Sequence, residues 1–390
     1  MNWADRVSPT VKSIPPSGIR RFFDIVADMK GVISLGVGEP DFVTPWHIRE
    51  SCVYGLQRGY TAYTSNHGLL ELREEIARMV QNRYQVTYDP RTEALITVGV
   101  SEALDLAMRA ILFPGDEVLV PEPCYVSYKA CVTLAGGTPL PIPTSVENEF
   151  RVQVADLEAK VSPRTKAILI GYPNNPTGAV MPREELLKIA AFASKHDLIV
   201  ISDEIYGDLT YDGVHTCFSS LPGMRDRTIL LNGFSKAYAM TGWRIGYALA
   251  NPDFIAAMTK IHQYTMLCAP VTGQIAAVEA LKNGEPQMRK MVDEYDRRRR
   301  LMLDGLRSMG LDCFEPRGAF YIFPSIAKTG LTALEFAEQL LKEEKVALVP
   351  GDAFGDCGQG FVRCSYAASF SNLSAALERL ERFVSRRLNG

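Results

Sequence analysis

The chain of 390 residues lacks the features that mark membrane, secreted and nucleic-acid-binding proteins. No apolar run reaches the roughly 18 residues of a membrane span, so we expect no membrane partner. The segment from Met1 to Arg6 lacks the charged and then apolar pattern of a signal peptide, which predicts a cytoplasmic protein. The formal net charge of −3 argues against nucleic acid as a partner.

Cysteine and histidine are present without the spacing of a metal site. The eight cysteines include no Cys-x-x-Cys pair, and the five histidines are not paired in sequence. Scattered thiols suit a reducing compartment, and the pattern predicts no metal ligands. The composition, with 47% hydrophobic and 22% charged residues, is that of an ordinary globular enzyme.

Length and hydrophobic pattern predict two domains. The chain exceeds what one hydrophobic core usually serves. Between residues 94 and 250, apolar segments alternate with helical patterns such as 183–196. This alternation predicts an α/β fold, with a mainly parallel sheet between layers of helices. The predicted strands are 94–99, 117–121, 138–142, 165–170, 198–202, 228–232 and 244–250.

The pattern changes near residue 285, where a smaller α+β domain is predicted to begin. A long, charged helical pattern comes first, over residues 288–309. The basic run 297–300 within it predicts a solvated face of the helix and not a nucleic-acid patch. The other predicted elements are helices over 333–344 and 373–386 and strands over 346–349 and 361–364.

Lys236 and Arg244 carry the most specific chemical signal. They lie eight residues apart, with small and glycine residues between them. A lysine can form a Schiff base with an aldehyde, and an arginine can hold a phosphate by charge-assisted hydrogen bonds. Pyridoxal phosphate (PLP) carries both groups. Taken alone, such a pair is more often two solvated surface charges.

Polar residues follow two of the predicted strands. Asp203 ends one apolar run, and Asn175 lies in the Asn-Asn-Pro-Thr-Gly turn after another. Open α/β sheets bind ligands at the carboxyl ends of their strands. There Asp203 could keep a pyridine nitrogen protonated, and Tyr206 and Asn175 could reach the phenolic oxygen of the ring. The alternative is that these residues only cap and form turns.

A strand also runs through Gly99 directly into a helical pattern. Such a junction offers the free backbone N–H groups of Val100 and Ser101, together with the helix dipole, to an anion. Strand–glycine–helix junctions are common, so this signal is weak by itself.

These ordered motifs resemble the class I, fold type I, PLP-dependent aminotransferases, in particular the aspartate and aromatic aminotransferase-like subgroup. The resemblance extends from Leu35-Gly36-Val37-Gly38-Glu39-Pro40-Asp41-Phe42 to the segment 361–366. It implies a mixed, mostly parallel seven-stranded sheet whose last strand is reversed. It also implies a large domain over 46–285 and a small domain formed by 1–45 and 286–390.

The resemblance implies how the cofactor, PLP, would be held. Lys236 would bind the aldehyde, Asp203 would face the pyridine nitrogen, and Tyr206 and Asn175 would share the phenolic oxygen. Many relatives place a helpful hydroxyl where this chain has Gly233. The residues expected at the phosphate are Val100, Ser101, Ser235 and Arg244.

Further residues are implied at the ring, the substrate and the subunit interface. Tyr125 would stack on the ring, although a tyrosine in such a loop is more often core. Tyr63 would reach the phosphate of a neighbouring subunit, which predicts a homodimer, although it is one of three nearby tyrosines. Arg363 would bind the substrate α-carboxylate with help from Gly38 and Asn175, although most arginines at strand ends simply reach water.

The implied activity is transfer of the amino group of an L-amino acid to a 2-oxo acid, with ping-pong kinetics. By family habit, the expected acceptor is 2-oxoglutarate. The donor is expected to be aromatic, aspartate or broad. Arg20 is a candidate contact for a distal carboxylate or a dimer salt bridge. The main alternative is another PLP enzyme of the same fold, such as a carbon–sulfur lyase.

Overall fold

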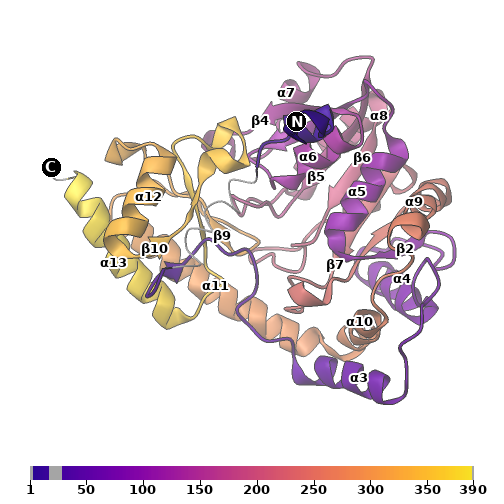
Figure 1. The fold of residues 1–390 in the computed structure, drawn as a ribbon. Coiled ribbons are helices and arrows are strands. Elements are labelled where there is room, and N and C mark those ends of the chain that lie inside the picture. Colours follow the sequence, from indigo (N-terminus) through magenta and orange to yellow (C-terminus); the bar gives the residue numbers. More distant parts are fainter. Residues whose placement is uncertain (1–2, 17–28, 389–390) are drawn as a thin grey trace.

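A seven-stranded sheet forms the centre of the computed structural model, which describes residues 3–16 and 29–388 (Figure 1). The strand order is β2-β8-β7-β6-β5-β3-β4, and β8 alone runs antiparallel to its neighbours. All seven predicted strands are therefore present, including the reversed one. Their bounds are β2 Ala94–Thr97, β3 Glu117–Glu122, β4 Thr138–Pro143, β5 Thr165–Gly171, β6 Ile199–Asp203, β7 Thr228–Gly233 and β8 Gly246–Leu249.

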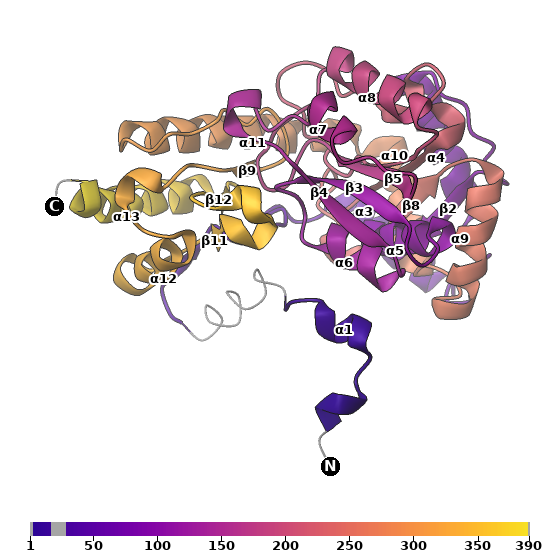
Figure 2. The same cartoon turned by 90° about the horizontal axis from the view of Figure 1, so that it is seen from above.

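Two helical layers cover the sheet because successive strand residues point to opposite faces. On β5, Ala167 and Leu169 pack in one core cluster, whereas Ile168 and Ile170 pack in another. Figure 2 shows α7 and α8 on one side of the strands and α5 and α6 on the other. The bounds are α5 Gly99–Ile111, α6 Ser127–Leu134, α7 Val154–Glu158, α8 Arg183–Lys195 and α9 Pro252–Thr265.

Among the boundaries that differ from the prediction, the end of β2 bears directly on the site. Gly99, predicted as the last residue of a strand, is instead the first residue of α5. Its φ of +74° turns the chain sharply from β2 into the helix, which a side chain would disfavour. The α5 N-terminus consequently points to the edge of the sheet where β6 and β7 end.

A group of three helices packs together beside the sheet. Helix α10 contacts both α3 and α4. The bounds of these elements, and of the short helix near the N-terminus, are α1 Pro9–Ser13, α3 Trp46–Gln57, α4 Leu70–Tyr84 and α10 Val271–Asn283.

The remaining elements form a smaller α+β body. A short antiparallel sheet has the order β11-β12-β9, and β1 pairs in parallel with β10. The long helix α11 packs against α13, which also contacts α12. The predicted strand 346–349 is two strands, β10 and β11. The bounds are β1 Ile33–Ser34, β9 Tyr321–Ile322, β10 Val346–Ala347, β11 Val349–Pro350, β12 Val362–Ser365, α11 Glu285–Ser308, α12 Ala333–Glu344 and α13 Phe370–Leu388.

The N-terminal strand crosses to the smaller body. Leu35 donates its backbone N–H to Ala347 O, and Ser365 donates to Leu35 O. These contacts favour the predicted division into 46–285 and 1–45 plus 286–390, which we keep as a proposal. Within the described residues, no helix is long and apolar enough to cross a membrane.

The prediction of a solvated face for the basic run on α11 is wrong for two of its four residues. Arg298 and Arg299 are buried, whereas the neighbours on either side are exposed. Arg298 donates to Asp41 at 2.7 Å and lies over the ring of Phe42. The segment that covers this face of α11 is distant in sequence, so the local pattern could not reveal it.

Candidate active site

A cavity of about 720 Å³ lies between the large sheet and the smaller body. Its wall is formed by the ends of β6 and β7, the first turn of α5, and residues of β9 and β12. It brings together eleven of the twelve predicted site residues, all except Tyr63. They are Gly38, Val100, Ser101, Tyr125, Asn175, Asp203, Tyr206, Ser235, Lys236, Arg244 and Arg363.

Asp203 is a buried carboxylate at the end of β6. Its Oδ1 accepts the backbone N–H of Ile205 at 3.2 Å, and its Oδ2 accepts the hydroxyl of Tyr128 at 2.8 Å. Burial raises the pKa of Asp203 to about 6, although the Tyr128 hydroxyl opposes this change. The carboxylate therefore lies where a cationic partner would stabilise its charged form.

Tyr128 was not identified from the sequence. It reaches Asp203 by crossing Gly171, which is the direct neighbour of Asp203 in the register of β5 and β6. A Cβ atom at Gly171 would overlap the Tyr128 hydroxyl, so glycine makes this approach possible. The only sequence signal was its position three residues after Tyr125.

Lys236 lies close to Asp203 and to two arginines. Its Nζ donates to Gly38 O at 2.6 Å. The pKa of Lys236 is lowered from 10.5 to about 8, mainly by burial and also by the charges of Arg363 and Arg244, while Glu39 opposes the change. The amine can therefore be neutral at mildly alkaline pH, where an exposed lysine is charged.

Arg244 and the first turn of α5 form a positive pole of the cavity. The helix begins at Gly99 without a side-chain cap, so its first N–H groups are free of intrahelical partners. The guanidinium lies so close that a Cβ at Gly99 would be 2.6 Å from Arg244 Nη2. A Cβ at Gly246 would likewise be 2.5 Å from Val100 N. Gly99 and Gly246 thus allow Arg244 and β8 to lie close to the first turn of α5. The free N–H groups and the guanidinium can then bind the same anion.

Gly233 has the same kind of constraint. A Cβ at this position would be 2.9 Å from Ile245 O, so a side chain there would require the neighbouring backbone to shift. This chain therefore has no hydroxyl two residues before Ser235, where many relatives place one. Ser235 itself is buried and lines the cavity.

Arg363 is a buried cation without a carboxylate partner among the described residues. Its Nη1 donates to Asn175 Oδ1 at 2.8 Å and its Nη2 to Gly36 O at 2.6 Å, while its Nε has no partner. Burial lowers the pKa of Arg363, but a guanidinium stays charged in proteins. A buried, unneutralised guanidinium with a free N–H is suited to bind an anion.

The two tyrosines with alternative interpretations lie in different environments. Tyr125 lines the cavity and packs edge-on against Tyr128, with ring centroids 5.7 Å apart. Tyr63 is 82% exposed and lies outside the cavity of its own chain. Arg20, the candidate for a distal carboxylate, lies outside the described residues.

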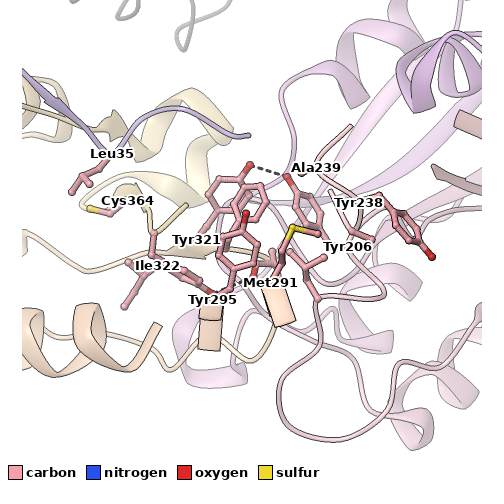
Figure 3. Close-up of a cluster of buried hydrophobic side chains, with 14 of the residues drawn as sticks. Leu35, Tyr206, Tyr238, Ala239, Met291, Tyr295, Tyr321, Ile322 and Cys364 are labelled. Atoms are coloured by element: carbon pink, nitrogen blue, oxygen red, sulfur yellow. Dashed lines mark hydrogen bonds between the residues drawn. The ribbon is translucent and has the colours of Figure 1, made fainter. Parts of the chain in front are cut away.

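Tyr206 is buried and contacts a second residue that was missed from the sequence, Tyr321 of β9. Their hydroxyl oxygens are 2.8 Å apart (Figure 3). Glu39 also lines the cavity, where Thr241 donates to its Oε2 at 3.0 Å. Tyr321 could not be found from local patterns, because 115 residues separate it from Tyr206.

Comparison with known proteins identifies the fold and the family. The fold is that of the fold type I aminotransferases, whose solved structures match nearly the whole chain. The family model described as aminotransferase class I and II matches residues 30–380. The chain therefore belongs to the class I and II aminotransferases, a family that in general depends on PLP.

Individual relatives are similar over almost their full length. The aspartate aminotransferase of Pyrococcus abyssi is 48% identical, over 97% of this chain and 98% of the relative. An aromatic-amino-acid aminotransferase of Thermococcus litoralis is 45% identical, with the same coverage. The structure of aspartate aminotransferase from Thermus thermophilus with maleate has a TM-score of 0.93 at 38% identity, covering 96% of this chain and 99% of that one.

Proposed function

We propose that the protein transfers the amino group of an L-amino acid to a 2-oxo acid with PLP as cofactor. The observation that carries this proposal is the arrangement around one cavity of an amine with a lowered pKa, Lys236, and a buried carboxylate, Asp203, opposite a positive pole. Each feature matches one group of the cofactor.

The residues fit PLP group by group. Asp203, with its charge destabilised by burial, suits a protonated pyridine nitrogen. Tyr206 and Asn175 supply donors for the phenolic oxygen, and Tyr125 supplies a ring for stacking. When bound, PLP supplies an electrophilic aldehyde and an electron-withdrawing ring. The phosphate would be held by Arg244, Ser101, Ser235 and the N–H groups of Val100 and Ser101.

The protein's own residues orient the substrate and move a proton. Arg363 would bind the α-carboxylate through its free Nε and an adjacent Nη, with Asn175 and the Gly38 backbone beside it. This fixes the Cα–H bond relative to the cofactor. The neutral amine of Lys236 can then take the Cα proton and return it, because its lowered pKa leaves a substantial neutral fraction near pH 8.

The two substrates would use one site in turn. The amino acid leaves as a 2-oxo acid before a second oxo acid enters, which gives ping-pong kinetics. We propose 2-oxoglutarate as the acceptor. A carbon–sulfur lyase of the same fold would share these residues and differ in its products.

The wall of the cavity favours donors with aromatic or other neutral side chains. Tyr125, Tyr321 and Leu104 offer apolar surface, and Glu39 adds a negative charge. A dicarboxylic substrate needs a further cation, for which Arg20 remains a candidate. The relatives named for aspartate and for aromatic donors are similar to this chain to nearly the same degree, so their names do not identify the donor of this protein. The basic residues in the described part of the wall are Lys236, Arg244 and Arg363. Each already has a proposed partner, so none of the three is left to bind a second substrate carboxylate.

We also propose a homodimer with shared active sites. Large apolar side chains are exposed on α3, on the segments directly before and after it, and at and just beyond the end of α9. Such a surface is unusual for a monomer and typical of an interface. A shared site would also give the exposed Tyr63 a phosphate to reach. The exposed residues are Val43, Trp46, Tyr54, Tyr60, Tyr63, Tyr264 and Met266.

Product analysis tests the proposed function. The PLP-loaded protein is incubated with 2-oxoglutarate and either L-phenylalanine or L-aspartate, and the oxo acid, glutamate and ammonia formed are measured. We expect equal amounts of glutamate and the new oxo acid, with no ammonia, and no turnover by Lys236→Ala. Ammonia formation without glutamate would identify a lyase or deaminase instead.

A further inference from the structure

Two phenol hydroxyls meet where the large sheet faces the smaller body. Tyr206 follows β6 of the large sheet, and Tyr321 lies on β9 of the smaller body. Their oxygen atoms are 2.8 Å apart, and the side chains are 6% and 1% exposed (Figure 3). The structure gives neither hydroxyl a second hydrogen-bond partner among the described residues.

Tyr321 contacts the site in two further ways. The guanidinium of Arg363 lies over its ring, with Cζ 4.4 Å from the centroid. Its hydroxyl lies against Gly38, where a Cβ atom would be 2.5 Å from the Tyr321 oxygen. The carbonyl of Gly38 in turn accepts Lys236 Nζ. Tyr321 therefore contacts three residues of the site. Tyr206 is proposed to bind the cofactor, Arg363 is proposed to bind the substrate carboxylate, and Gly38 accepts a hydrogen bond from the Lys236 amine.

The direction of the hydrogen bond between the two phenols matters for function. Each hydroxyl has one proton, and only one of them can lie between the two oxygens. If Tyr206 donated to Tyr321, it would have no proton left for a ligand in the cavity. If Tyr321 donates, the proton of Tyr206 is free to point at the ligand, and the chain of hydrogen bonds makes it a stronger donor.

We propose that Tyr321 is a positioning residue, whose hydroxyl donates to Tyr206 and whose ring holds the guanidinium of Arg363. The inference rests on the proposed function. It means that one side chain aligns both the phenol that faces the cofactor and the arginine that binds the substrate carboxylate.

The two roles can be separated by substitution. Tyr321→Phe removes the hydroxyl and keeps the ring beneath Arg363, whereas Tyr321→Leu removes both. Tyr295→Phe is a matched control, because Tyr295 belongs to the same buried aromatic cluster, its hydroxyl has no hydrogen-bond partner, and it does not line the cavity. The melting temperature of each variant reports whether it folds.

The hydroxyl is tested by titrating the visible band of the PLP-loaded protein with pH. A donor to the phenolic oxygen stabilises its negative charge and so lowers the midpoint of this titration. We expect Tyr206→Phe to move the midpoint to higher pH, and we expect Tyr321→Phe to move it in the same direction by a smaller amount. In the Tyr206→Phe background the second substitution should add nothing, because the Tyr321 hydroxyl acts through Tyr206.

Binding and kinetics test the ring. For Tyr321→Phe we expect kcat to fall about tenfold, because one buried hydrogen bond is lost. KM for amino acids should stay within about twofold of wild type, because the ring beneath Arg363 is kept. For Tyr321→Leu we expect KM to rise by a further factor of about five, the loss of a cation–π contact. The dissociation constant of the cofactor-free protein for PLP should rise in both variants and stay unchanged in Tyr295→Phe.

Several outcomes would overturn the inference while leaving the proposed function intact. A midpoint that moves to lower pH in Tyr321→Phe would show that Tyr321 is an acceptor that competes for the Tyr206 proton. Additive shifts of the midpoint in the double variant would show that the Tyr321 hydroxyl does not act through Tyr206. An unchanged KM in Tyr321→Leu would show that the ring does not hold Arg363 in place. Failure of the wild-type protein to transaminate would instead refute the proposed function itself.

Discussion

The buried carboxylate of Asp203 should make the cofactor-free protein less stable at neutral pH. Its pKa is about 6 in the folded protein and 3.8 when it is exposed. A carboxyl with a raised pKa binds its proton more tightly when folded, so its favourable contribution is complete below pH 3.8 and is lost as the pH rises to about 6. Two pKa units correspond to about 3 kcal/mol.

We therefore predict that Asp203→Asn stabilises the cofactor-free protein near pH 7.5. The neutral amide avoids the cost of a buried charge, but it offers one acceptor oxygen to two donors, Tyr128 and the Ile205 N–H. Loss of one of these hydrogen bonds costs about 1 kcal/mol. The expected net gain is about 2 kcal/mol at neutral pH, and it disappears toward pH 4.

The assay is urea unfolding of the cofactor-free wild type and variant across this pH range. Asp304→Asn, at an exposed position on α11, is the control and should show no such pH-dependent gain. The same Asp203→Asn variant should lose most transaminase activity when loaded with PLP. A variant that is no more stable than wild type at pH 7.5, or a gain that is equal at every pH, would refute the reasoning.

Four further predictions follow from the same geometry. Lys236→Ala should bind PLP and lose turnover, so any normal rate in the coupled glutamate assay would contradict its role. Arg363→Ala should raise KM for every amino acid by about 100-fold, because it removes a charge-assisted hydrogen bond worth about 3 kcal/mol. A rise in KM for one donor class only would show that the α-carboxylate binds elsewhere. Gly171→Ala should lower activity as much as Tyr128→Phe, because the added methyl displaces the Tyr128 hydroxyl from Asp203. Measuring the transamination rates of the two variants side by side tests this. The rate of the first half-reaction should rise with pH toward about 8, as Lys236 loses its proton, and a rate that falls over this range in stopped-flow measurements would exclude the amine as the base.

Most of the fold followed from periodicity in the sequence. Apolar strands of four to seven residues recur between helical patterns, and each of the predicted strands in the large sheet is present. The reversed direction of β8 came from the family resemblance, because strand direction has no local signature. The boundary at Gly99 was misjudged because an apolar glycine-containing segment reads equally well as strand or helix start.

The site was predictable where a residue carries its own chemical signal. Lys236, Asp203 and Arg244 lie at the ends of recognisable elements, and the fold brings them to one cavity. Tyr128 and Tyr321 were not predicted, because their partners Asp203 and Tyr206 are 75 and 115 residues away in sequence. Their positions depend on long-range packing across Gly171 and Gly38, which a single sequence does not reveal.

The visible absorption spectrum of the PLP-loaded protein gives the most direct test of the central claim. It is recorded before and after addition of a single L-amino acid, without any oxo acid. The account predicts that the pyridoxal band is replaced by a pyridoxamine band, and that subsequent addition of 2-oxoglutarate restores it. A pyridoxal band that no amino acid converts, or conversion that releases ammonia, would contradict an aminotransferase function.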